Sequence, residues 1–158
     1  MIGKRILVVD DEENLRRVTQ LKLQQAGYEA MTASDGAQAL DLLSKHPRDL
    51  VLTDLKMPGM SGIDLLGKIK EDYPEVIVVL VTAFGTIESA VEAMRLGAYD
   101  YVIKPVNSES LNLVVSRALE HHRLREEVRN LRSAIDRKYG FENIIGKSKN
   151  LLAMLDNA

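Results

Sequence analysis

The sequence predicts an α/β fold, a doubly wound five-stranded parallel sheet followed by an extended C-terminal helix. Five short runs rich in Ile, Leu and Val alternate with five longer segments of helical period. This alternation is typical of βαβ units, which build parallel sheets with helices on both faces. After about residue 106 the alternation stops, and residues 108–138 contain neither Gly nor Pro. That stretch predicts one long helix.

The predicted strands are short, apolar and rich in β-branched residues. Residues 76–81 form the most hydrophobic run, as expected for a strand that is covered on both faces. Residues 28–32 form the weakest. The five predicted strands are residues 6–9, 28–32, 50–53, 76–81 and 101–103.

The helices between these strands carry their own start and stop signals. Acidic residues after the first strand suit a helix N-terminus, and Gly27 ends that helix. Ser34 or Asp35 is the candidate N-cap of the second helix. Further boundaries are marked by Pro47, Pro74, Gly97, and Asn107 or Ser108.

Polar side chains gather at one edge of the predicted sheet. In open α/β sheets, ligands bind beyond the carboxyl ends of the strands. Four of the five predicted strands end there at an acid, a hydroxyl or an amine. Each such residue alone would be an ordinary cap, turn or solvated residue, and only the joint placement indicates a site. The residues are Asp10, Asp11, Asp54, Thr82 and Lys104.

The three carboxylates indicate a divalent cation, because neighbouring carboxylates repel one another unless a cation joins them. Mg²⁺ suits such a site, since it prefers oxygen ligands and leaves room for phosphate oxygens. We expect Asp11 and Asp54 to bind the metal directly. We expect Asp10 to act largely through a water, and the backbone carbonyl of Lys56 to supply a further oxygen.

Asp54 is the expected nucleophile toward a phosphoryl group, because it ends the central strand between the other polar groups. Phosphoryl transfer depends mainly on positioning and charge neutralisation. Lys104 would neutralise charge on the phosphoryl oxygens as a point charge. The Thr82 hydroxyl would bind another of those oxygens.

Two alternative functions remain open, and the first would use the same acids. A metal-dependent phosphatase or phosphotransferase acting on a small molecule would also need a general acid and a cap over the substrate, and the sequence offers no insertion for either. A dimerisation module that has lost phosphorylation is the other alternative. The presence of all five site residues argues against it.

Four motifs in order closely resemble the receiver domain of two-component response regulators. They are residues 6–12 (Ile-Leu-Val-Val-Asp-Asp-Glu), 54–59 (Asp-Leu-Lys-Met-Pro-Gly), 81–83 (Val-Thr-Ala) and 101–105 (Tyr-Val-Ile-Lys-Pro). The resemblance covers about residues 3–122, and we assign residues 1–122 to this domain. It implies a flavodoxin-like sheet in the order 2-1-3-4-5.

The resemblance also implies roles for individual residues. Asp54 would be the phosphoacceptor, Asp10 and Asp11 the acidic metal pair, and a sensor histidine kinase the partner. Thr82 would be the switch hydroxyl and Tyr101 the switch aromatic, which rotates inward after phosphorylation. Lys104 would be the invariant-type lysine of the family, and its peptide bond to Pro105 would be cis.

An apolar seam at heptad spacing follows the domain, with steps of four, three and four residues. Charged residues flank it. We expect residues 123–139 to form a coiled-coil linker helix that joins two copies in a homodimer. The alternatives are a helix that packs back on its own domain and a frayed helix. The seam residues are Leu124, Val128, Leu131 and Ile135.

Residues 140–158 resemble the start of the AAA+ ATPase domain in nitrogen-regulation-type activators of sigma-54 polymerase. The resemblance implies that the receiver controls such a domain, with that polymerase as a further partner. Gly146-Lys147-Ser148 lacks the upstream glycine of a P-loop. We therefore expect a truncated piece that is no enzyme beyond self-phosphorylation and slow autodephosphorylation.

The composition fits a soluble cytoplasmic protein. The formal net charge is −2, which argues against a large basic face and direct nucleic-acid contact. The absence of cysteine excludes disulfides and thiolate metal sites. The N-terminal apolar run is too short for a signal peptide, and no run is long enough to cross a membrane.

Overall fold

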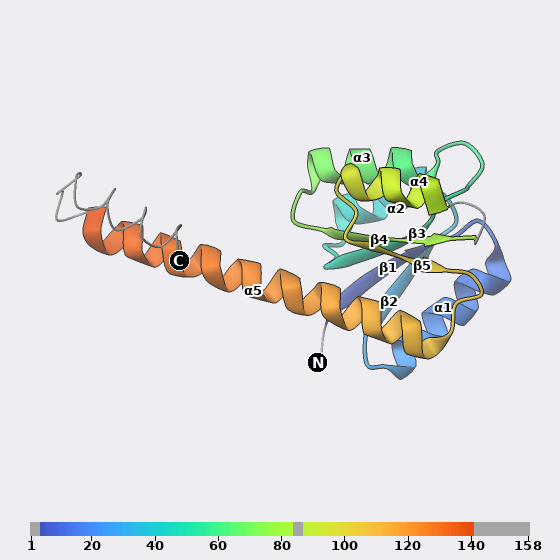
Figure 1. Ribbon diagram of the computed structural model, residues 1–158, viewed down its shortest axis with the longest axis horizontal. Coiled ribbons are helices and arrows are strands. Elements are labelled where there is room, and N and C mark those ends of the chain that lie inside the picture. The colour runs from blue at the N-terminus through green and yellow to red at the C-terminus, as the bar shows by residue number, and fades with distance from the viewer. Residues whose placement is uncertain (1–3, 84–86, 141–158) are drawn as a thin grey trace. The chain divides into compact units, whose positions relative to one another are not determined.

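A computed structural model describes residues 4–83 and 87–140. Five strands alternate with five helices, as predicted (Figure 1). The strands are β1 (Arg5–Val9), β2 (Glu29–Ala33), β3 (Leu50–Asp54), β4 (Ile77–Thr82) and β5 (Asp100–Ile103). The helices are α1 (Glu13–Gln25), α2 (Gly36–Lys45), α3 (Gly62–Asp72), α4 (Ile87–Arg95) and α5 (Ser108–Gly140).

All five strands pair in parallel, in the order β2-β1-β3-β4-β5. The predicted fold class and strand order are confirmed. β3 lies at the centre, and β3 and β4 are buried along their whole length. Because β1 and β3 are neighbours, the residues that follow β1 lie beside the end of β3.

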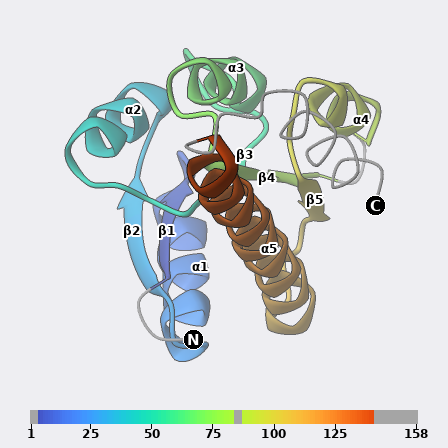
Figure 2. The same ribbon diagram turned by 90° about the vertical axis from the view of Figure 1, so that its left-hand side faces the viewer.

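Helices cover both faces of the sheet, with α2, α3 and α4 on one side and α1 and the first part of α5 on the other (Figure 2). A hydrophobic core lies on each face of the sheet. Alternate residues of a strand belong to different cores, because successive side chains point to opposite faces. Leu7 and Val9 of β1 pack with Leu66 of α3, whereas Ile6 and Val8 belong to the core that includes Leu111 of α5.

The predicted strand at residues 28–32 begins one residue later, at Glu29. The reason is the C-terminal cap of α1. The N–H of Tyr28 donates to the carbonyl of Leu23 at 3.1 Å, and that of Gly27 to Gln24 at 3.0 Å. Gly27 has a φ of 97°, so the pair forms a Schellman motif and Tyr28 belongs to the helix end.

Side-chain caps mark the starts of α2, α3 and α5, and those of α2 and α5 lie at the predicted helix boundaries. Asp35 caps α2, because its side chain accepts a hydrogen bond from the N–H of Gln38 at 2.7 Å. Asn107 does the same for α5 by accepting from the N–H of Ser110 at 2.7 Å. Ser61 and Asp64 form a reciprocal capping box at the start of α3.

The chain divides into two compact units, Met1–Leu119 and Glu120–Ala158, so α5 runs through the boundary. Its first part packs on the sheet through Leu111, Val115 and Leu119. No helix in the described ranges is both long and apolar enough to cross a membrane.

Candidate functional site

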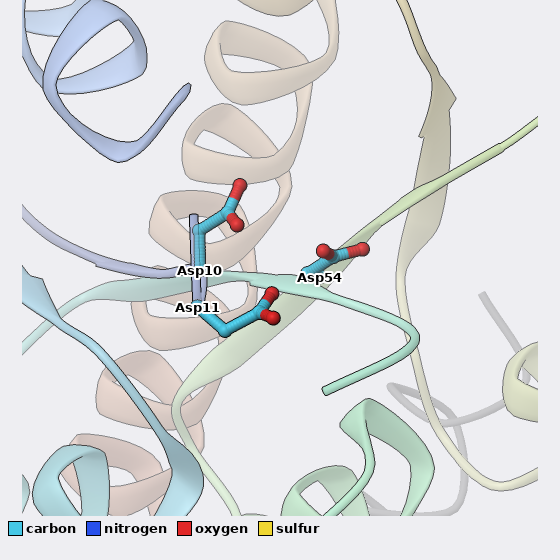
Figure 3. A group of neighbouring side chains, drawn as sticks. All are labelled: Asp10, Asp11 and Asp54. Atoms are coloured by element: carbon cyan, nitrogen blue, oxygen red, sulfur yellow. The ribbon is translucent and has the colours of Figure 1, made fainter. Parts of the chain in front are cut away.

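Three carboxylates meet at the carboxyl edge of the sheet, as predicted. Asp10 and Asp11 follow β1, and Asp54 is the last residue of β3. One carboxylate oxygen of each lies within 4.8 Å of the others, and Figure 3 shows the three groups side by side. Asp10 and Asp54 are buried, whereas Asp11 is exposed. A cluster of oxygen donors with one open side fits a hard divalent cation.

The chain around Asp10 is fixed by backbone contacts. Its N–H donates to the carbonyl of Ala33 at 3.1 Å, and Arg16 Nη1 donates to its carbonyl at 2.9 Å. The Asp10 carboxylate accepts the N–H of Glu12 at 2.9 Å. Burial raises the pKa of this carboxyl above its ordinary value of 3.8, against the lowering effect of that hydrogen bond.

Lys104 reaches the central acid directly. Its Nζ donates a hydrogen bond to Oδ2 of Asp54 at 3.0 Å. Burial alone would lower the pKa of the Lys104 ammonium group. The hydrogen bond that Lys104 donates to Asp54 and the charges of Asp54, Asp10 and Glu12 outweigh burial and raise this pKa above 10.5. Lys104 is therefore charged at neutral pH.

Thr82 ends β4 with its side chain fully buried, and its Oγ1 donates to the carbonyl of Ala83 at 3.3 Å. Its own carbonyl accepts the backbone N–H of Lys104 at 2.8 Å, which ties the two strand ends together. Tyr101 lies on β5 opposite Leu80 and is half-buried against the core. Lys56 is exposed in the connection after β3.

The peptide bond between Lys104 and Pro105 is cis, as the resemblance implied.

Gly62 is a residue of the site that sequence reasoning missed. It begins α3, and its N–H donates to the carbonyl of Leu55 at 2.8 Å. A Cβ at this position would collide with the carbonyl oxygen of Asp54 and lie 2.9 Å from Cα of Leu55. Only glycine lets α3 approach the backbone of the phosphoacceptor candidate so closely. In the sequence, Gly62 resembles an ordinary loop glycine.

Comparison with known proteins decides the family. Residues 6–116 match the response regulator receiver domain. The chain belongs to this family. The chain is 40% identical to the regulatory protein AtoC of Escherichia coli over 152 residues, which cover 96% of this chain and 32% of AtoC. It is 41% identical to the nitrogen assimilation regulatory protein NtrX of Azorhizobium caulinodans, over 80% of this chain and 28% of NtrX.

Solved structures agree. NtrX from Brucella abortus in complex with ADP superposes with a TM-score of 0.80 at 40% identity, over 82% of this chain and 30% of that one. The isolated receiver domain of the same NtrX superposes with a TM-score of 0.71 at 42% identity, over 73% of this chain and 98% of that domain. The nitrogen-regulation-type resemblance is confirmed by these relatives. This chain spans about a third of the length of the curated relatives.

The predicted seam lies on the second part of α5. Leu124, Val128 and Leu131 have 47%, 49% and 64% of their surface exposed. Arg123 pairs with Glu120 at 2.6 Å and with Glu127 at 2.7 Å beside them. The side chain of Ile135 and the predicted AAA+ segment from residue 141 onward lie outside the described residues.

Proposed function

We propose that this receiver domain is a phosphorylation-dependent signalling switch that accepts a phosphoryl group on Asp54 from a histidine kinase in the cytoplasm. The observation that carries the proposal is the 3.0 Å hydrogen bond from Lys104 to a buried aspartate that has two further carboxylates beside it. A carboxylate stands at the end of the central strand, and the positive charge of Lys104 lies next to it.

In the proposed reaction an Asp54 oxygen attacks the phosphorus, and the bond from phosphorus to the donor's imidazole nitrogen breaks. That nitrogen keeps the electron pair and takes up a proton. Lys104 neutralises charge on the transferred group. Thr82 turns toward a phosphoryl oxygen, and Tyr101 moves inward into the space that the threonine leaves.

Mg²⁺ would neutralise part of the charge on the phosphoryl oxygens when bound. Asp11 and Asp54 would hold it directly, Asp10 through a water, and Lys56 through its carbonyl. The clustering of three carboxylate oxygens within 4.8 Å supports this assignment, because their mutual repulsion is relieved by a cation.

We further propose that the output passes through a homodimer to an AAA+ domain of a sigma-54 activator, with the chain acting as a regulator and not as an ATPase. The exposed seam of Leu124, Val128 and Leu131 supports the dimer. The matched NtrX is crystallised with ADP and is longer than this chain, which supports a nucleotide-binding domain beyond the receiver.

The test is intact-mass spectrometry after incubation with acetyl phosphate and Mg²⁺, with Asp54→Asn as the control. We expect one base-labile phosphoryl adduct on the wild type and none on the variant. Absence of an adduct on folded wild-type protein would overturn the phosphoacceptor assignment and favour a dimerisation module.

A further inference from the structure

A lysine outside the acidic cluster contacts the connection that carries Lys104. Lys22 lies in the last turn of α1, and its Nζ donates a hydrogen bond to the carbonyl of Val106 at 2.6 Å. Residues 22 and 106 are 84 positions apart in the chain. The bond joins α1 to the segment between β5 and α5, two residues after Lys104.

This segment lies over a cavity of about 410 Å³ between α1 and the strand ends. Its walls are mostly apolar, and Lys104, Pro105 and Val106 line it together with Lys22. A backbone that borders an open cavity has fewer packing contacts to hold it than one in a close-packed core. Hydrogen bonds therefore matter more for its position.

The backbone at Lys104 is held on one side by its N–H, which donates to the carbonyl of Thr82 at 2.8 Å. On the other side, the bond from Lys22 holds Val106. Lys22 is half-buried, so water competes less for its ammonium group than at an open surface. The two bonds therefore fix the backbone at Lys104, which contacts Asp54, and two residues after it.

We propose that Lys22 is a positioning residue for phosphoryl transfer: it holds the segment after β5 so that Lys104 stays aligned with Asp54. This inference rests on the proposed function. Charge stabilisation of a transferring group depends steeply on geometry, so a looser segment lowers the rate without changing the fold. The inference also means that α1 and the catalytic lysine are mechanically linked.

The experiment compares Lys22→Met, Lys22→Arg and the matched control Arg17→Met in the whole chain. Met keeps the length of the side chain and removes the donor, whereas Arg keeps a donor. Arg17 is an exposed residue of the same helix. Rates of phosphoryl uptake from acetyl phosphate at saturating Mg²⁺ are followed by intact mass, about 20 °C below the lowest melting midpoint so that unfolding does not contribute.

We expect Lys22→Met to slow uptake about tenfold, Lys22→Arg to restore most of the rate, and Arg17→Met to match the wild type. A Lys22→Met rate equal to that of the wild type would overturn the inference. Equal slowing in Lys22→Met and Lys22→Arg would overturn it as well, because the donor would then be irrelevant. A wild type that takes up no phosphoryl group would instead remove the proposed function itself.

Discussion

Lys104 holds its ammonium group 3.0 Å from Oδ2 of Asp54, so the acid and the base of the site are already paired before any phosphoryl group arrives. The pairing spans 50 residues and joins the ends of β3 and β5 across β4. In the proposed phosphoryl transfer, a charge in this place would act on the carboxylate in the ground state and on the phosphoryl oxygens during transfer.

Replacing Lys104 with Met should slow phosphoryl uptake from acetyl phosphate about 100-fold, because a positioned charge is lost from the transition state. Lys68→Met serves as the control, since this lysine is exposed on α3. Stopped time points analysed by intact mass give the rates. Equal rates for Lys104→Met and the control would contradict a catalytic role.

The raised pKa of Asp10 gives a prediction for stability against pH. A folded pKa above the ordinary 3.8 means that folding favours the protonated form. That contribution is present below pH 3.8 and is lost as the pH rises through the folded pKa, so ionised Asp10 costs stability at pH 7. Asp10→Asn should therefore raise the melting temperature of the metal-free protein at pH 7 by about 2–5 °C, with a smaller gain near pH 4.

The order of the melting temperatures of the wild type and Asp10→Asn should reverse when Mg²⁺ is added. At the proposed metal site the cation would stabilise the ionised cluster, so we expect the melting temperature of the wild type to rise more than that of Asp10→Asn. Asn keeps an acceptor for the N–H of Glu12, so the turn after β1 is retained. Asp41→Asn on the exposed side of α2 is the control and should show no gain in metal-free buffer. If Mg²⁺ raised the melting temperature of Asp10→Asn more than that of the wild type, the metal assignment would be refuted.

Gly62 offers a test of how tightly α3 is set against Asp54. Gly62→Ala should lower the free energy of unfolding by about 2–3 kcal/mol, because the new methyl group meets backbone atoms that cannot move aside. Gly67→Ala on the same helix meets nothing within 4 Å and should be neutral or stabilising by up to about 1 kcal/mol. Urea unfolding measures both, and an equal effect of the two substitutions would contradict the close approach.

Periodicity explains why the fold could be predicted from the sequence. Apolar runs, and the glycines, prolines and caps between them, define five strands. The rule for parallel sheets then places Asp10, Asp54 and Lys104 at one edge. Close backbone approach and contacts between distant residues leave no such local pattern. Gly62 and the bond from Lys22 to Val106 therefore could not be predicted. The apolar pattern also places Tyr28 in a strand, although this residue completes a helix cap.

The apolar seam on α5 predicts a dimer that one charge should weaken. Val128→Asp places a carboxylate among Leu124 and Leu131, which have 47% and 64% of their surface exposed and would be buried between two parallel helices. We expect the dissociation constant to rise at least about tenfold in analytical ultracentrifugation, since apolar burial is lost at the interface. Asn130→Asp adds the same charge at an exposed position of the same helix and should leave the dimer intact. A wild type that sediments as a monomer at high concentration, or equal weakening by both substitutions, would mean that the seam is not the interface.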